Sequence, residues 1–310
     1  MKVAVAGATG VLGRALIPKL IAAGHSPLLV VRNVAKAREL FRNLPVEVTE
    51  CDLIASATTE HTVAKLIGGC EGLIHAATAI PSNFNAPGAW TNNTLLRIRG
   101  TGRLERAALD VGVEVFLCQS IIMAYPDGGD AWLDEHTHID SSPERRDTCH
   151  AVAIMESMMW LLRKHPKQMR WSILKGGIFV GPGTFQERTI EHIRRGELVV
   201  PGDGSHFISP VHVEDVADAY VLALELAPKQ SVFNICDEPI RYGDYVDGLA
   251  DRVGAPHPRR DPSLPKPPSH RATNAAARET LRWSPRHSIW PADDLALVSG
   301  QPRKSNGEVQ

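Results

Sequence analysis

Several features are scarce or missing in this chain of 310 residues, and each absence excludes a class of protein. Aromatic residues make up only 5% of it, and 34 basic side chains nearly balance 35 acidic ones, for a formal charge of −1. A chain this close to neutral has no general attraction for nucleic acid or for an acidic membrane surface. No apolar run is long enough to span a bilayer, and the first residues lead straight into a strand instead of a signal peptide. We therefore expect a cytoplasmic protein that binds neither nucleic acid nor membrane.

The cysteines and histidines show no pattern of a disulfide framework or a metal site. The five cysteines are an odd number without a CxxC pair, and most lie in or beside apolar stretches, as buried thiols do. His136 and His138 are two residues apart, but no third ligand is spaced nearby. The sequence therefore predicts reduced cysteines and no metal.

Short apolar runs alternate with helix-length segments through the first part of the chain. The runs lie at 3–7, 27–32, 46–52, 72–78, 113–120 and 171–177. Between the first two, Leu12, Leu16 and Leu20 fall on one helical face, and Gly24 is placed to end the helix. This rhythm predicts an α/β fold, a Rossmann-type doubly wound parallel sheet of about seven strands.

After residue 177 the rhythm breaks into pieces separated by glycine and proline. Helices are expected at 213–227 and near 243–253, and a late strand at 231–236. We predict a dinucleotide-binding domain over 1–176 that also receives this late strand. A smaller C-terminal substrate lobe would comprise 177–230 and 237–295, and 296–310 would form a frayed tail.

The clearest functional motif is the segment GATGVLG at residues 7–13, which follows a strand and opens a helix. Gly7 permits a tight turn, Gly10 lets the backbone approach a pyrophosphate, and Gly13 allows the helix and strand to pack closely. The motif therefore predicts that the protein binds a dinucleotide.

Arg32 ends the second predicted strand, where an acidic residue would bind a ribose 2′-hydroxyl. The planar guanidinium suits a 2′-phosphate instead, because it can donate two hydrogen bonds to it. This favours NADP over NAD as the cofactor. The alternative is that Arg32 is only an exposed arginine at the end of a strand.

The spacing Gly7-x-x-Gly10-x-x-Gly13 resembles the short-chain dehydrogenase/reductase superfamily. Further segments are similar to its extended branch of epimerase/dehydratase-like proteins: HAAT at 75–78, RGTGRLERAALDVGV at 99–113, GPG at 181–183, VHVEDVADA at 211–219 and LRWSPRHSI at 281–289. The resemblance covers nearly the whole chain. It implies a nicotinamide cofactor, a small-molecule substrate, and a homodimer formed through helices at 93–110 and 150–165. The residues expected at the cofactor are Gly7, Thr9, Gly10, Val11, Leu12, Gly13, Arg32, Asp52, Leu53, Ala76, Ala77, Thr78, Gln119, Lys175 and Ile178.

The catalytic residues that the resemblance implies are not found at the matching positions. In the family a Ser or Thr, a Tyr and a Lys four residues later pass a proton to or from the substrate oxygen as hydride moves. Anchored on Tyr125, the Ser position falls on Ile121; anchored on Glu156, the Tyr and Lys positions fall on Thr148 and Val152. No YxxxK occurs anywhere in the chain. The protein thus resembles an atypical member that has lost the usual proton relay.

Two residues are candidates for a substitute. His150 lies at the start of the same helix and has the intrinsic pKa of an acid/base catalyst, and Ser120 lies beside the Ser position near the end of a strand. The leading hypothesis is an NADP-binding oxidoreductase or epimerase/dehydratase-like enzyme that acts on a small hydroxy- or carbonyl-containing metabolite with a non-standard relay. The alternatives are a non-catalytic NADP-sensing regulatory protein and a non-redox lyase or cyclase on the same fold.

Overall fold

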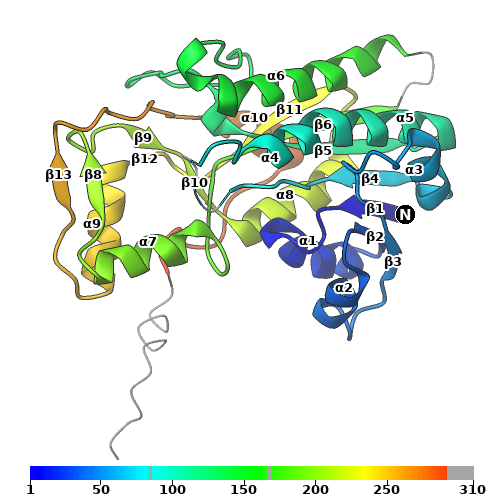
Figure 1. The fold of residues 1–310 in the computed structure, drawn as a ribbon, viewed down its shortest axis with the longest axis horizontal. Helices are drawn as coiled ribbons and strands as arrows, with labels where there is room; N and C mark the ends of the chain where they lie inside the picture. The colour runs from blue at the N-terminus through cyan, green and yellow to red at the C-terminus, as the bar shows by residue number, and fades with distance from the viewer. Residues whose placement is uncertain (82, 84–85, 166–168, 292–310) are drawn as a thin grey trace, which may run out of the picture.

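The structure is a computed structural model that describes residues 1–81, 83, 86–165 and 169–291. A large helix-covered sheet forms one part of the molecule, and a smaller lobe lies at its side (Figure 1). The predicted tail at 296–310 and the end of the predicted lobe at 292–295 lie outside the described residues.

The central sheet has seven parallel strands in the order β11-β6-β5-β4-β1-β2-β3. They are β1 (Lys2–Ala6), β2 (Ser26–Val31), β3 (Glu47–Glu50), β4 (Gly72–His75), β5 (Val115–Ile121), β6 (Arg170–Gly176) and β11 (Ser231–Ile235). The chain starts at the centre, runs to one edge and then returns past β1 to the other edge, which is the doubly wound arrangement. The predicted fold class and the late strand are confirmed.

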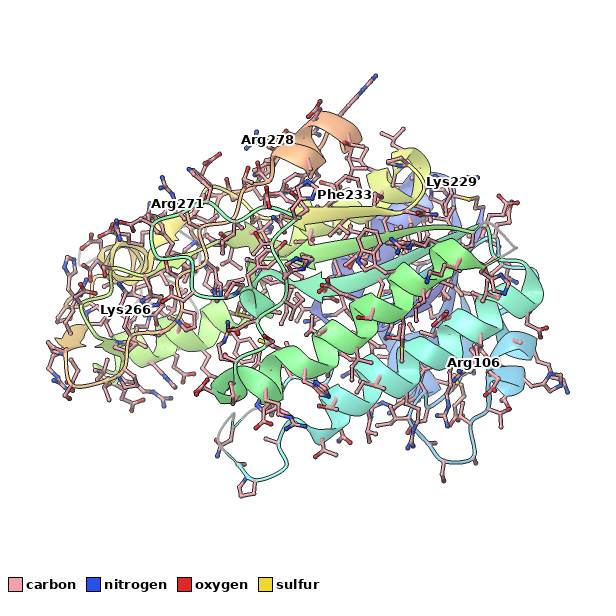
Figure 2. All side chains as sticks on the ribbon, turned by 90° about the horizontal axis from the view of Figure 1, so that it is seen from above. Arg106, Lys229, Phe233, Lys266, Arg271 and Arg278 are labelled. Carbon is pink, nitrogen blue, oxygen red and sulfur yellow. The ribbon has the colours of Figure 1, made fainter. Side chains whose placement is uncertain are left out.

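Helices cover both faces of the sheet. They are α1 (Val11–Ala22), α2 (Val34–Leu40), α3 (Glu60–Ile67), α4 (Thr91–Leu95), α5 (Thr101–Val111), α6 (Arg146–Leu161), α8 (Val213–Leu226) and α10 (Ala275–Leu281). A π-helical turn at Leu96–Gly100 joins α4 to α5, and short 3-10 turns lie at Ile122–Ala124, Pro143–Arg145 and Leu162–Lys164. Figure 2 shows α5 and α6 crossing one face of the sheet side by side.

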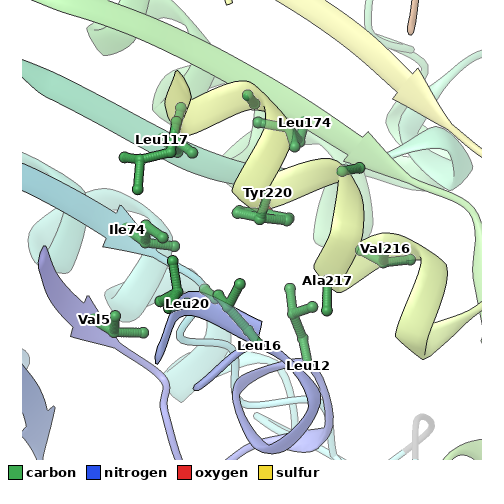
Figure 3. Close-up of a cluster of buried hydrophobic side chains, with 14 of the residues drawn as sticks. Val5, Leu12, Leu16, Leu20, Ile74, Leu117, Leu174, Val216, Ala217 and Tyr220 are labelled. Atoms are coloured by element: carbon green, nitrogen blue, oxygen red, sulfur yellow. The ribbon is translucent and has the colours of Figure 1, made fainter. Parts of the chain in front are cut away.

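The opposite face is covered by α1 and α8. Leu12, Leu16 and Leu20 of α1 are buried together against α8 and the strands, as the spacing of these leucines predicts (Figure 3). Burial of each such side chain stabilises the fold by about 1.5–3 kcal/mol. This packing holds the N-terminus of α1 at the carboxyl edge of the sheet.

The smaller lobe has a hydrophobic core of its own. Its elements are β7 (Ile178–Val180), α7 (Phe185–Arg194), β8 (Val199–Pro201), β9 (Phe207–Ile208), β10 (Pro210–His212), β12 (Ile240–Arg241), α9 (Tyr242–Arg252) and β13 (Arg259–Asp261). The strands form three small sheets, β7 with β10, β9 with β12, and β8 with β13. The predicted helices at 213–227 and 243–253 are confirmed as α8 and α9. Helices α8 and α10, which fall within the predicted lobe segments 177–230 and 237–295, pack against the central sheet.

Candidate active site

The glycine loop is a tight turn with no room for side chains at two of its positions. Gly7 has φ +95, and a Cβ built there would lie 2.5 Å from the backbone of Ala76. A Cβ on Gly13 would lie 2.3 Å from the carbonyl oxygen of Ala8, so the helix and the preceding turn touch through backbone atoms. The amide of Gly10 donates to the carbonyl of Gly7 at 3.0 Å and leaves Gly10 exposed at the N-terminus of α1.

This loop fits the pyrophosphate of a dinucleotide. The first turn of α1 contains no acidic residue, so nothing opposes the partial positive charge of its free amide groups. Leu12 and Gly13 are buried behind the loop, while Thr9 and Val11 are half-buried beside the exposed Gly10. A Cβ on Gly183 would lie 2.4 Å from the guanidinium of Arg14, which places the loop at 181–183 of the smaller lobe against the start of α1.

Arg32 and Asp52 follow two adjacent strands, where the adenosine end of a dinucleotide is expected. The amide of Cys51 donates to the carbonyl of Val31 at 2.8 Å, so the segments after β2 and β3 are still paired just before these residues. Arg32 is exposed, and Asp52 is half-buried and accepts a hydrogen bond from the amide of Ile54 at 3.0 Å. Leu53 is buried beneath this turn.

The remaining residues expected at the cofactor lie at the carboxyl ends of β4, β5, β6 and the start of β7. They are Ala76, Ala77, Thr78, Gln119, Lys175 and Ile178. Because β4, β5 and β6 are neighbours in the sheet, these ends meet along one edge. Most of these residues are half-buried, whereas Ala76 and Lys175 are buried.

A buried ion pair lies next to this edge. The Lys175 ammonium is 3.0 Å from the carboxylate of Glu156 on α6, and the hydroxyl of Ser120 donates to the other carboxylate oxygen. All three residues are at most 7% exposed. Ser120 and Lys175 are direct register partners on β5 and β6, so the sheet itself brings them together. The Ser120 proton is therefore committed to Glu156.

A second set of polar contacts continues from this pair. The Lys175 ammonium lies 4.5 Å from the centre of the Tyr125 ring, and the Tyr125 hydroxyl donates to the side chain of Asn234 at 2.9 Å. The backbone amide of Asn234 donates to the carboxylate of Glu135 at 2.7 Å. Burial, aided by the Glu135 and Glu156 carboxylates, raises the pKa of Tyr125 well above its ordinary value. Tyr125 is thus a protonated, hydrogen-bonded core residue.

The positions of the missing relay lie on the first two turns of α6. Val152 is fully buried and Thr148 is half-buried. His150 is exposed, and the structure places it outside the hydrogen-bonded set that contains Ser120. Cys149 is buried, and desolvation raises the pKa of its thiol, which keeps it in the form that is a poor nucleophile.

Sequence reasoning missed a buried cation at this edge. Arg97, in the π-helical turn before α5, is only 4% exposed. Its Nη1 atom lies 3.5 Å from the carbonyl oxygen of Gln119 and 3.5 Å from the sulfur of Met155, which is on the turn of α6 after Val152. Its Nε atom has no hydrogen-bond partner among the described residues. No local pattern in the sequence signals this burial, because an arginine on a helix is usually exposed.

The described residues provide no metal site, no disulfide and no membrane-spanning helix. No group of three or more His, Cys, Asp or Glu side chains in the described residues is arranged to hold a metal ion. The five cysteines are free and buried. None of the described helices has the length and apolar character needed to cross a membrane.

The fold and the glycine loop together define a class of enzyme, the NAD(P)-dependent oxidoreductases and epimerases built on a Rossmann sheet. Within this class, the chain belongs to the NAD dependent epimerase/dehydratase family, whose model matches residues 3–236. The predicted resemblance is thereby confirmed.

Relatives and solved structures extend the comparison over nearly the full chain. A 3-diazoavenalumate denitrifying reductase from a Streptomyces species is 29% identical over 309 residues, covering 94% of this chain and 98% of the relative. UDP-glucose 4-epimerase from Thermus thermophilus, in complex with NAD, has a TM-score of 0.78 and 17% identity and covers 97% of this chain and 100% of its own. A dTDP-glucose 4,6-dehydratase from Streptomyces venezuelae, with NAD and TYD bound, has a TM-score of 0.79 and 17% identity, covering 96% and 95%. At this identity the solved structures show the shared fold.

Proposed function

We propose that the protein is an NADPH-dependent reductase that delivers hydride to a substrate carbon from which a neutral leaving group departs, as dinitrogen departs from a diazonium carbon. The observation that carries this proposal is the combination of a complete dinucleotide loop with a missing proton relay. Thr148 and Val152 stand at the Tyr and Lys positions, and the hydroxyls of Ser120 and Tyr125 are bound to other side chains.

Reduction of a carbonyl requires a proton for the developing alkoxide, and the family's Tyr supplies it. A diazonium carbon needs no such proton. It gains hydride to form a C–H bond, the C–N bond electrons leave with dinitrogen, and the positive charge is neutralised: R–N₂⁺ + H⁻ gives R–H + N₂. The denitrifying reductase at 29% identity supports this reaction class. When bound, the reduced nicotinamide supplies the hydride.

Several residues of the chain hold the cofactor in this proposal. The free amide groups in the first turn of α1 bind the pyrophosphate, and Arg32 binds the 2′-phosphate, which favours NADP over NAD. We assign Arg97 to the nicotinamide ribose, because a buried guanidinium with an unpartnered Nε atom lies where β5 and α6 meet. His150 is exposed and remains a proposed acid for substrates that do need a proton.

The reaction is tested with a benzenediazonium salt and NADPH carrying deuterium at C4 of the nicotinamide. We expect one dinitrogen released per NADPH oxidised and deuterium at the carbon that carried nitrogen, measured by mass spectrometry. The comparison variant is Gly10→Val, which fills the pyrophosphate cradle. Its extended backbone (φ −75, ψ 177) suits a β-branched residue, and the added Cβ would lie 3.2 Å from the Gly7 carbonyl oxygen. This variant should fall to the rate of NADPH without enzyme. NADPH binding with no deuterium transfer would refute the reductase and favour the sensing role.

Arg97→Met tests the assigned role of the buried cation. Because a hydrogen bond from a charged group contributes about 1.5–3 kcal/mol, we expect NADPH to bind about 10- to 100-fold more weakly. Adenosine 2′,5′-bisphosphate, which lacks the nicotinamide ribose, should bind unchanged by calorimetry. The control is Arg99→Met, an exposed neighbour whose guanidinium donates to the carbonyl of Ile54 at 3.1 Å. Equal weakening of both nucleotides by Arg97→Met would show a structural role instead.

A further inference from the structure

A pocket of about 160 Å³ lies in the smaller lobe, among β7, the start of α7, β9 and the start of α9. Figure 1 shows α7, β9 and α9 on the side of the molecule away from the N-terminus. The pocket wall begins at Ile178, two residues after β6 ends at Gly176. It therefore adjoins the edge of the central sheet where the nicotinamide end of the cofactor is expected.

The pocket wall is mostly apolar. None of its nine lining residues has a charged side chain, and Phe179, Phe185 and Ile208 are among the apolar ones. The one side-chain amide, Gln186, is saturated: it accepts from the amide of Gly181 at 3.0 Å and donates to the Tyr245 hydroxyl at 2.9 Å and the Ile289 carbonyl at 2.7 Å. A pyrophosphate in this pocket would find no counter-charge, so its desolvation would be uncompensated.

The pocket volume matches one aromatic ring. An engineered apolar cavity of about 150 Å³ lined by Leu, Ile and Phe binds a single benzene molecule. The pocket is of this size, and its aromatic lining can pack a ring edge-to-face or offset. A sugar ring of similar size carries hydroxyl groups that this wall could not satisfy.

Tyr242 supplies the one polar group in the wall without a partner. Its ring stacks on that of His206 with centroids 5.0 Å apart, and its amide donates to the His206 carbonyl at 2.9 Å, so the side chain is held in place. Its hydroxyl has no hydrogen-bond partner among the described residues. Burial raises the pKa of this phenol, which keeps it a hydrogen-bond donor at neutral pH.

We propose that this pocket binds the aromatic ring of the substrate, and that the Tyr242 hydroxyl donates to an oxygen substituent on that ring. The substrate class is then an oxygen-bearing aryl compound, not a nucleotide sugar. The inference deepens the proposed reductase function and rests on it, because the ring must lie beside Ile178 for its carbon to receive hydride.

Binding to the protein loaded with NADP⁺ tests the pocket without any turnover. We use calorimetry with phenol, with toluene as a ring of similar size without oxygen, and with UDP-glucose. We expect phenol to bind more tightly than UDP-glucose. Tyr242→Phe should weaken phenol by about 5-fold, the value of one neutral hydrogen bond, and leave toluene unchanged. Phe185→Ala should weaken both rings.

Leu264→Ala is the matched control. Leu264 lies in the same lobe and is 42% exposed, against 40% for Phe185, but does not line the pocket. Its substitution should change neither affinity. Tighter binding of UDP-glucose than of phenol, or phenol binding that neither Tyr242→Phe nor Phe185→Ala changes, overturns the inference. Phenol binding that responds to both variants as expected, together with no deuterium transfer to a diazonium acceptor, supports the pocket and overturns the reductase function.

Discussion

Lys175→Met is expected to lower the free energy of unfolding by about 3–5 kcal/mol, the cost of removing one partner from a buried ion pair. The Glu156 carboxylate would remain buried with only the Ser120 hydroxyl as a hydrogen-bond donor. Urea denaturation followed by circular dichroism measures the change. A matched control is Lys2→Met, because the Lys2–Glu47 pair has the same chemistry but side chains 32% and 63% exposed. Lys2→Met should lower the free energy of unfolding by less than about 1 kcal/mol.

The double variant Lys175→Met/Glu156→Gln distinguishes the loss of the ion pair from the loss of core packing. It removes both charges, keeps a group that can accept the Ser120 proton, and should recover most of the lost stability. A double variant no more stable than Lys175→Met alone would show that the lysine acts through packing on Tyr125, whose ring it covers at 4.5 Å.

The parts of the site that could be predicted from the sequence are those set by local backbone geometry. Gly7 has a positive φ, and Gly13 touches backbone atoms that leave no room for a Cβ. Both positions therefore require glycine at a fixed distance after a strand. The leucine face of α1 follows from helical period in the same way. Such features depend on residues within one turn of each other, so the order of residues is enough to find them.

The polar interior depends on register between distant segments, which local patterns do not report. Ser120 meets Lys175 only because β5 pairs with β6 in one particular register, and a shift of one residue would turn either side chain to the other face. Asn234 joins them because β11 pairs with β6 beside Lys175. Arg97 was overlooked for a related reason, since arginines on helices are usually exposed and its burial follows from α6 packing over it.

Arg32→Asp is expected to weaken NADPH binding by at least about 100-fold, because the variant removes two charge-assisted hydrogen bonds of about 1.5–3 kcal/mol each. It also places a carboxylate where it repels the 2′-phosphate. NADH affinity should stay equal or rise, because an acidic residue at this position can accept a hydrogen bond from the ribose 2′-hydroxyl. Fluorescence titration with the two reduced nucleotides measures both affinities.

The control for long-range charge is Arg38→Asp. Arg38 is exposed on α2, six residues further along the chain, and its replacement changes the net charge by the same amount. If the 2′-phosphate contacts Arg32 directly, Arg38→Asp should cost far less affinity, and that smaller loss should fade as salt screens it. Equal losses of NADPH affinity in Arg32→Asp and Arg38→Asp would mean that the 2′-phosphate is attracted only by the combined charge of the surface, without a direct contact to Arg32. Equal losses of NADPH and NADH in Arg32→Asp would instead remove the argument for NADP, and NAD would become the expected cofactor.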